Sequence, residues 1–355
     1  MLSKIGVIGR TAEGTSLCDG QTIKTRILVD ELKAKYPSTE IIIADTYNFK
    51  KNYHSLLKSI IRCMRESNVV FILLSRNGRR IIFPIVNFLN LFFKKPIIHD
   101  VIGGGSEELI RKYPTLKWHY NQFTVNWVES LKLVDRLKEL GIDNAEYLPN
   151  FKRLSCISSE EIKPHEGAIY KFCTFSRVTR EKGIGIASQA IIDINRKAGS
   201  CKAVLDIYGP IEDGYEEELQ RYVDSSDGAV NYKGIVDYND SVSVLNNYYM
   251  LLFPTSFYGE GFPGTLIDAF SAGLPVIATD WHYNGEIISY NITGFLYATD
   301  EAHRLKELIE YSMNHPDLIN AMRYHCLTEA KKYSADTVME IISRRIDSLA
   351  HKKDK

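Results

Sequence analysis

Short apolar runs alternate with helical patterns along the chain, and this alternation is the strongest constraint on the fold. Most of the runs are continuous, which is typical of parallel strands covered on both faces. The strands predicted in the first half are residues 5–8, 40–44, 69–74, 96–99, 123–126 and 145–148. Those predicted in the second half are residues 170–176, 203–208, 230–232, 249–253, 275–279 and 294–297. Strands that alternate with helices predict an α/β fold, here as two doubly wound domains.

The length of 355 residues also favours two domains. The polar stretch 155–166, which contains Pro164, is the expected linker. We therefore expect an N-terminal Rossmann-like domain over 1–160 and a C-terminal one over 161–335. A last helix, at about 336–355, is expected to pack back on one of the two, with the first domain preferred.

Composition excludes several classes of function. The net charge is zero, so no nucleic-acid partner is indicated. The six cysteines are scattered, without metal-ligand spacing, and predict reduced thiols in a cytoplasmic protein. Residues 1–9 lack the apolar core of a signal peptide, which agrees with a cytoplasmic location.

The most informative motif is the stretch Glu260-Gly-Phe-Pro-Gly-Thr-Leu-Ile-Asp268. It lies between a predicted strand at 249–253 and a predicted helix at 265–272, which Gly273 ends. The first turn of such a helix offers unpaired N–H groups to a diphosphate, and carboxylates suit sugar hydroxyls. The alternative is a solvated loop glutamate and an aspartate on the helix surface.

Two cations follow another predicted strand. Arg177 and Lys182 come after the strand that ends at Ser176, and both are good phosphate partners. Arg180 competes with Arg177 for this role, but Arg177 is nearer the strand end. A plain solvated loop is the alternative. The chain contains no Asp-x-Asp, the usual metal-binding motif of nucleotide-sugar enzymes, so the cations and helix N–H groups are expected to neutralise the diphosphate.

Together these motifs resemble glycosyltransferase family 4, the retaining GT-B enzymes that use a nucleotide-sugar donor. The family signature is an acidic pair separated by seven intervening residues around Gly-Phe-Pro, and here the second acid is Asp268 in place of the usual glutamate. Further landmarks that match follow in chain order. They are Tyr208-Gly-Pro210, Tyr232-Lys-Gly234, Trp281 to Glu286 and Thr293-Gly-Phe-Leu-Tyr297.

The resemblance also covers the first domain. Ile98-His99-Asp100 is similar to the strand-end histidine that lies beside the transferred sugar in the family, although a buried core histidine is the alternative. The loop 9–20 takes the place of the glycine loop near the donor phosphates, with Gly20 as the candidate contact.

The resemblance implies a GT-B fold and a role for each matched residue. Asp268 would bind the ribose, and the N–H groups of Thr265 and Leu266 would bind the diphosphate. Arg177 and Lys182 would stabilise the departing nucleoside diphosphate. Glu260 would contact the donor sugar hydroxyls, assisted by the N–H groups of Phe262 to Gly264, and His99 would lie near the reacting carbon. Gly261 and Pro263 would belong to the same donor-binding stretch.

The expected function is transfer of a sugar from a UDP-sugar, with retention and without metal or cofactor, to a lipid-linked glycan. Bacterial-type surface polysaccharide assembly is the expected setting. Same-face attack and double displacement both stay open. The rival functions are a GT-B epimerase or phosphorylase and a non-catalytic nucleotide-sugar-binding subunit of a glycan assembly complex.

Residues 81–93 form an apolar segment that is too short to span a bilayer. Eight basic residues and one acid lie around it, a balance of eight minus one, or +7: Lys58, Arg62, Arg65, Arg76, Arg79, Arg80, Lys94, Lys95 and Glu66. Such a segment suits a helix lying on an anionic membrane, and we expect a cytoplasmic protein with peripheral membrane contact. A core helix buried on all sides is the alternative.

Overall fold

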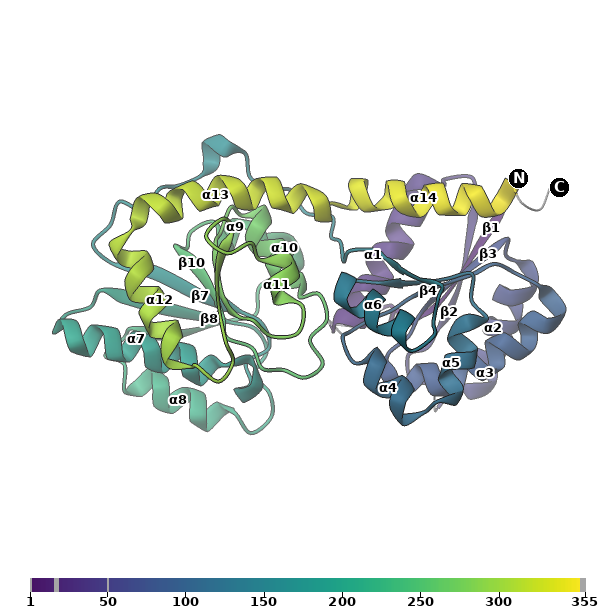
Figure 1. The fold of residues 1–355 in the computed structure, drawn as a ribbon, viewed down its shortest axis with the longest axis horizontal. Helices are drawn as coiled ribbons and strands as arrows, with labels where there is room; N and C mark the ends of the chain where they lie inside the picture. Colours follow the sequence, from purple (N-terminus) through teal and green to yellow (C-terminus); the bar gives the residue numbers. More distant parts are fainter. Residues whose placement is uncertain (1, 16–18, 50, 352–355) are drawn as a thin grey trace. The chain divides into compact units, whose positions relative to one another are not determined.

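The computed structural model of the protein describes residues 2–15, 19–49 and 51–351. The chain divides into two compact units (Figure 1). The first unit comprises Met1–Arg153, Gly259–Phe262 and Ala335–Lys355, and the second comprises Leu154–Tyr258 and Pro263–Ser334. Three residues of the Glu260–Asp268 stretch, Glu260 to Phe262, therefore group with the first unit, although the flanking sequence belongs to the second.

The first unit is built on a parallel sheet, six-stranded within the described residues, in the order β2-β1-β3-β4-β5-β6. Its strands are β1 Lys4–Gly9, β2 Glu40–Asp45, β3 Val69–Leu73, β4 Ile97–Asp100, β5 Val125–Val128 and β6 Ala145–Tyr147. Its helices are α1 Gly20–Lys35, α2 Tyr53–Glu66, α3 Arg76–Phe93, α4 Ser106–Lys112, α5 Thr115–Asn121, α6 Leu131–Glu139 and α14 Ala335–His351. The sheet is the doubly wound arrangement that the continuous apolar runs predict.

Helices cover both faces of this sheet. One face packs against α1 and α14 in a shared core that includes Leu28, Phe71 and Ile342. In Figure 1, helices α2 to α5 lie on the side of the sheet opposite α14. Because α14 follows the second unit in sequence yet contributes to this core, the chain returns to the first unit at its end.

The second unit contains another parallel sheet, six-stranded in the described part of the chain, in the order β12-β11-β10-β7-β8-β9. Its strands are β7 Tyr170–Phe175, β8 Ala203–Tyr208, β9 Val230–Gly234, β10 Met250–Phe253, β11 Val276–Thr279 and β12 Gly294–Tyr297. Its helices are α7 Ile184–Ala198, α8 Glu216–Asp224, α9 Ser241–Leu245, α10 Gly264–Ser271, α11 Asn284–Ile287, α12 His303–Asn314 and α13 Pro316–Ala330. Short 3₁₀ turns join them: η1 Ser159–Glu161, η2 Arg180–Lys182, η3 Tyr238–Asp240 and η4 Lys331–Tyr333.

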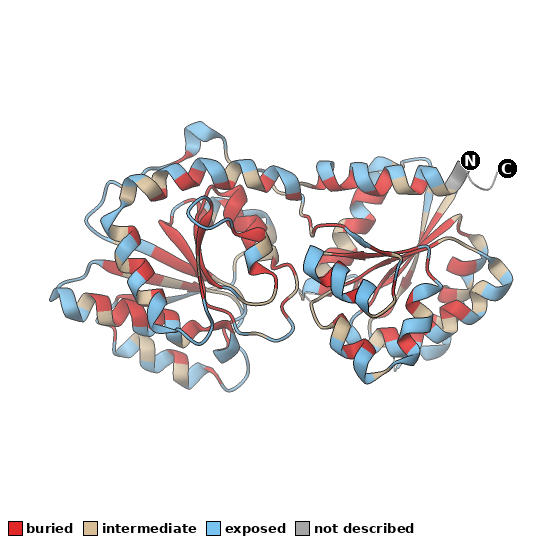
Figure 2. Cartoon of the chain, viewed as in Figure 1, coloured by how far each residue is buried: buried red, intermediate tan, exposed pale blue. Residues whose placement is uncertain are grey.

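The core of the second unit packs α7, α8 and α12 against one face of its sheet. Figure 2 shows the buried residues gathered on the strands and on the helix faces that meet them in both units. The predicted α/β class with two Rossmann-like domains is confirmed, and each predicted strand is present. Some observed strand boundaries differ slightly from the predicted ones. For example, β4 begins at Ile97 rather than at residue 96, because Pro96 has no N–H to donate to the sheet.

The segment 81–93 is part of α3 and is amphipathic. Ile82, Phe83 and Val86 are buried, whereas Phe88, Leu91 and Phe92 are 61%, 63% and 69% exposed. The alternative of a helix buried on all sides is therefore wrong. Among the described residues, no helix combines the length and apolar character that crossing a membrane requires.

The basic residues around α3 are less available than the sequence suggested. Arg79 is buried, where it donates to the carbonyl of Leu74 and to the hydroxyls of Ser106 and Tyr120. Arg62 and Arg65 pair with acidic residues, and Arg76 pairs with Glu108. The count of +7 thus overstates the charge that this surface presents.

Candidate functional site

The loops that follow β7 and β10 lie beside each other. The two strands are neighbours in the sheet, with Phe172 opposite Met250 and Cys173 opposite Leu251, so their carboxyl ends share one edge. The N–H of Ser256 donates to the carbonyl of Glu181 at 2.8 Å and ties the loops together. Carboxyl ends of parallel strands are where α/β folds bind ligands.

Arg177 and Lys182, the two cations predicted from the sequence, meet at one aromatic ring in this edge. The guanidinium carbon of Arg177 lies 4.9 Å from the centroid of the Phe257 ring, and Lys182 Nζ lies 5.0 Å from it. Lys182 is buried, while Arg177 is exposed. The negative face of the ring offsets part of the repulsion between the two cations. The two cations thus share one ring, an arrangement of the kind that suits a diphosphate.

Arg180, the competing arginine, is directed elsewhere. It is 82% exposed and pairs with Glu218 on α8. The sequence-based preference for Arg177 over Arg180 agrees with this geometry.

Two glycines allow the loops to approach each other beside these cations. Gly183 has φ of +72°, and a Cβ there would overlap the carbonyl oxygen of Pro254. Gly209, from the motif Tyr208-Gly-Pro210, has φ of +133°, and its Cβ would overlap the carbonyl oxygen of Ser176. Both positions therefore need glycine for backbone conformation and space.

Helix α10 begins directly after this edge. Pro263 precedes it and no side chain caps its first turn. The N–H of Leu266 donates to the Pro263 carbonyl at 3.0 Å, so this predicted diphosphate donor is already used within the turn. The hydroxyl oxygen of Thr265 is buried without a hydrogen-bond partner, so Thr265 offers an unused polar atom at the helix start.

Both acids of the pair are withdrawn from solvent. Asp268 is 3% exposed on α10 in the second unit, and Glu260 is 8% exposed in the segment that groups with the first unit. The alternative of two solvated surface carboxylates is therefore wrong. Buried carboxylates need partners, which makes both side chains specific features of the structure.

The backbone around Glu260 is held within the first unit. The N–H of Phe262 donates to Glu129 Oε2 at 3.3 Å, and the Phe262 carbonyl accepts from Asn150 Nδ2 at 3.1 Å. The predicted use of the Phe262 N–H for the donor sugar needs correction, because in this structure that group is bonded to Glu129.

His99 lies inside the first unit rather than at its surface. It is fully buried among Phe83, Tyr120 and Phe123. Its Nδ1 lies 2.8 Å from Asn126 Oδ1. The amide nitrogen of Asn126 donates to the Tyr120 carbonyl, so Oδ1 accepts and Nδ1 carries the proton.

This environment keeps the imidazole neutral. Burial, together with repulsion from Arg79, holds the pKa of His99 well below its usual value. Nε2 has no hydrogen-bond partner among the residues that the structure describes. The burial of His99 matches the alternative of a core histidine, and its predicted place beside the donor sugar stays a prediction.

Gly20 is the first residue of α1. Asp19 caps this helix by accepting from the N–H groups of Gln21 and Thr22. A Cβ at Gly20 would meet no atom of the described residues within 4 Å. Residues 16–18 of the same loop, including Cys18, lie outside the described residues.

Four residues that the structure brings into view were given no role from the sequence: Lys24, Glu129, Phe257 and Asp100, the last of which was named only as part of the Ile98-His99-Asp100 motif. Asp100 and Glu129 follow neighbouring strands, which was a usable signal, because such residues share an edge of the sheet. Phe257 carried no signal beyond its place in the loop before Glu260. Within residues 2–15, 19–49 and 51–351, no group of three or more His, Cys, Asp or Glu is arranged to hold a metal ion.

Comparison with known proteins agrees with this site. Residues 170–315, which include Arg177, Lys182 and the whole Glu260–Asp268 stretch, match the family model described as glycosyl transferases group 1. The chain is 31% identical over 166 residues to the UDP-N-acetylglucosamine–peptide N-acetylglucosaminyltransferase GtfA subunit of Streptococcus agalactiae. It is 25% identical over 156 residues to the amylovoran biosynthesis glycosyltransferase AmsK of Erwinia amylovora.

These matches are partial. The first covers 46% of this chain and 31% of the relative, and the second covers 42% and 37%. The chain therefore spans about a third of the length of these curated relatives.

The fold match is wider. The crystal structure of Anabaena HepE in complex with UDP matches with a TM-score of 0.77 at 13% identity, over 98% of this chain and 100% of that one. The family match and the fold confirm the resemblance to GT-B glycosyltransferases, which are transferases. Membership of family 4 stays a prediction. The chain thus has the two-domain GT-B fold, and its residues 170–315 match the family model of glycosyl transferases group 1.

Proposed function

We propose that the protein transfers a sugar from a UDP-sugar to a glycan acceptor, with retention of anomeric configuration and without a metal ion. The observation that supports this most directly is the pair Arg177 and Lys182 on the ring of Phe257, at the strand edge used for ligands in this fold. UDP as the nucleotide is supported by the complexes of HepE with UDP and with UDP-glucose.

The proposed chemistry uses charge more than covalent catalysis. The bond between the anomeric carbon and the diphosphate oxygen breaks, and the bonding electrons leave with the nucleoside diphosphate. Arg177 and Lys182 stabilise the negative charge that develops on that diphosphate, in the manner of other preorganised cations. The acceptor hydroxyl attacks the same face of the sugar, and its proton passes to the departing phosphate oxygen.

The other predicted residues complete the donor site. Asp268 binds the ribose hydroxyls, Thr265 contributes its N–H and its unused hydroxyl to the phosphates, and Glu260 contacts the sugar. Gly20 allows a phosphate to approach the start of α1, because no side chain occupies that space. His99 supports the sheet edge from inside, and its unpartnered Nε2 is the atom that it would offer to the donor sugar.

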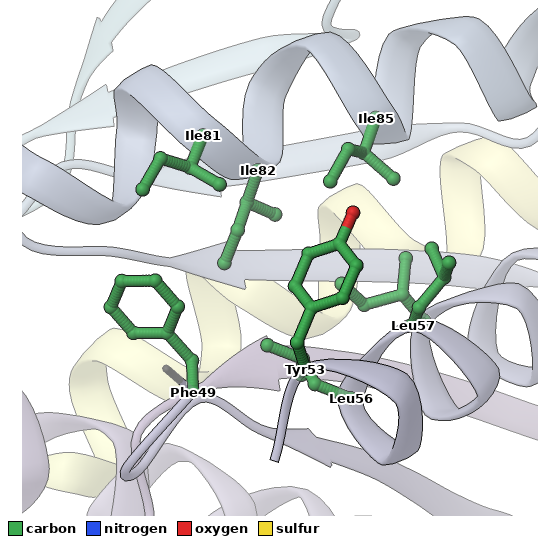
Figure 3. A pocket seen from close by; sticks show the side chains of 8 residues that line it. Phe49, Tyr53, Leu56, Leu57, Ile81, Ile82 and Ile85 are labelled. Carbon is green, nitrogen blue, oxygen red and sulfur yellow. The ribbon is translucent and has the colours of Figure 1, made fainter. Parts of the chain in front are cut away.

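We propose a lipid-linked glycan as acceptor and contact of α3 with an anionic membrane. Phe88, Leu91 and Phe92 are exposed and, at positions i, i+3 and i+4, lie on one face of this helix near its C-terminus. The exposed Lys94 follows directly after the helix. Figure 3 shows an apolar pocket beside this helix. It is lined by residues of α2 and α3 and by Phe49 in the loop before α2. Apolar side chains beside lysine suit the boundary between acyl chains and anionic headgroups.

The membrane proposal has a direct test. Phe92→Glu should reduce sedimentation with phosphatidylglycerol vesicles severalfold, because a carboxylate opposes both apolar insertion and anionic lipid. Tyr324→Glu, which changes an exposed aromatic residue on α13, is the matched control and should bind as the wild type does. Equal binding by Phe92→Glu and wild type, or no binding by wild type, would remove this part of the proposal.

The reaction is tested with a panel of UDP-sugars and a glycan acceptor in the presence of EDTA. NMR of the product should show the anomeric configuration of the donor. An inverted product would exclude retention, and recovery of activity only with added Mg²⁺ or Mn²⁺ would exclude metal independence. Isomerised donor formed without acceptor would identify an epimerase instead, and tight donor binding without any turnover would identify a non-catalytic subunit.

A further inference from the structure

A buried charge cluster lies at the carboxyl ends of β4 and β5 in the first unit. Lys24 Nζ, from α1, lies 2.7 Å from Asp100 Oδ1 and 2.7 Å from Glu129 Oε1. The side chains of Lys24, Asp100 and Glu129 are 5%, 2% and 10% exposed. Neither the sequence motifs nor the proposed donor site accounts for this cluster.

Such a cluster is a poor way to stabilise a fold. Removing charges from water costs several kcal/mol per ion, and apolar residues of similar volume often do as well or better. Burial raises the pKa of Asp100 to about 6, although Lys24 opposes that shift. The arrangement therefore calls for a function other than stability.

Glu129 extends the cluster to the Glu260 stretch. While Oε1 accepts from Lys24, Oε2 accepts the N–H of Phe262 at 3.3 Å. Lys24 thus fixes the orientation of a carboxylate whose second oxygen contacts the backbone two residues after Glu260.

The backbone there is closely packed. A Cβ on Gly261 would lie 2.9 Å from the Cα of Gly103 and 3.1 Å from Glu129 Oε2. Gly261 therefore lets the segment approach both Glu129 and Gly103, which lies in the loop after β4. The Asn150 amide fixes the Phe262 carbonyl from another direction.

We infer that Glu129, oriented by Lys24, is a positioning residue that holds the turn carrying Glu260. The inference rests on the proposed function for its kinetic consequence, but the contact itself can be tested without turnover. Glu129 does not touch the substrate; it fixes the backbone from which Glu260 reaches the donor sugar.

Hydrogen exchange of the segment 259–264 tests the contact. Glu129→Ala should speed exchange at Phe262 about tenfold, the effect of losing one hydrogen bond, with exchange in β4 and β5 unchanged. Glu129→Gln keeps an acceptor oxygen and should show a smaller increase. Glu139→Ala, an exposed glutamate on α6, is the control and should match wild type. Unchanged exchange at Phe262 in Glu129→Ala would overturn the inference.

Kinetics then separate positioning from donor binding. Glu129→Ala should lower kcat about tenfold or more while the affinity for UDP stays within about twofold, because Arg177 and Lys182 are untouched. Glu129→Gln should recover part of kcat. Gly261→Ala, which leaves Glu129 intact but displaces the turn, should reproduce the loss.

Failure of the positioning role of Glu129 can be distinguished from failure of the proposed function. Full activity of Glu129→Ala and Gly261→Ala, in an enzyme that Lys182→Ala inactivates, would overturn the positioning role and leave the proposed function in place. Absence of turnover by the wild type would overturn the proposed function, and the exchange of Phe262 would still decide whether Glu129 holds the turn.

Discussion

At the residue scale, the site depends on one aromatic ring that no motif predicted. Phe257 lies within 5.0 Å of both Arg177 and Lys182, measured from the ring centroid. Two cations near each other repel, and the ring face offsets this repulsion before any ligand binds. The ring therefore holds both side chains at one place, which in the proposed function is where the diphosphate binds.

Phe257→Leu should weaken UDP binding about tenfold, because it keeps an apolar side chain but removes two cation–π contacts of about 0.5–1 kcal/mol each. Isothermal titration calorimetry with UDP measures this. Phe88→Leu, on the exposed face of α3, is the matched control. Unaltered affinity in Phe257→Leu would mean that the ring does not orient the cations.

The buried His99 should make the free energy of unfolding depend on pH. Its pKa in the folded protein lies well below the unfolded value, so below about pH 6.5 the unfolded chain binds a proton that the folded protein does not. Stability should therefore fall with decreasing pH, by up to about 1.4 kcal/mol per pH unit from this group. Urea unfolding of wild type and His99→Gln between pH 7.5 and 5 checks this. The prediction would be contradicted if the free energy of unfolding fell equally with pH in the two proteins. Asp100 and the other carboxyls are common to both, so only the difference between the curves reports on His99.

Two glycines should behave in opposite ways. Gly183→Ala should destabilise the protein by at least about 1–3 kcal/mol, since its φ is +72° and its Cβ has no space. Gly20→Ala should leave Tm unchanged, because its Cβ meets open space, yet weaken donor binding if a phosphate lies there. Thermal unfolding and UDP titration of both variants are the measurements. A large loss of Tm in Gly20→Ala would show that the glycine serves the fold rather than the ligand.

At the element scale, strands were more predictable than the directions of side chains. Continuous apolar runs identify buried parallel strands from local sequence, and each predicted strand is present. The helix after Pro263 was equally clear, since Gly273 and Pro275 end it. What α3 buries depends on its neighbours, and the sequence left that open between core and membrane.

Other parts of the candidate site depend on tertiary packing. The orientation of His99 into an aromatic pocket, rather than toward the strand edge, depends on α3 and α5. The Phe262 N–H bonds to Glu129, which is 133 positions away in the chain. Single-sequence patterns identified Arg177 and Lys182 as candidates, but their shared ring required the structure.

Helix α14 should behave as part of the first unit's core. Ile342→Ala should lower the free energy of unfolding by about 2–5 kcal/mol, because Ile342 is fully buried. Its neighbour Ile341, which is 42% exposed, gives the control, and Ile341→Ala should change stability by less than about 1 kcal/mol. Chemical denaturation compares them. Equal effects of the two substitutions would mean that α14 does not pack in this register.

At the scale of the whole molecule, the chain contributes a separate core to each of two units and returns to the first with α14. The acidic pair follows the same division, because Glu260 groups with the first unit and Asp268 with the second. In the proposed function, the second unit supplies the cations for the diphosphate.

The central claim is that Arg177 and Lys182 stabilise a departing nucleoside diphosphate. The most direct measurement is release of UDP from a UDP-sugar by wild type, Lys182→Ala and the control Arg180→Ala, whose side chain pairs with Glu218. We predict that wild type and Arg180→Ala turn over the same donor at similar rates and that Lys182→Ala is about 10²–10³ times slower in kcat. Equal rates for Lys182→Ala and wild type would contradict the account.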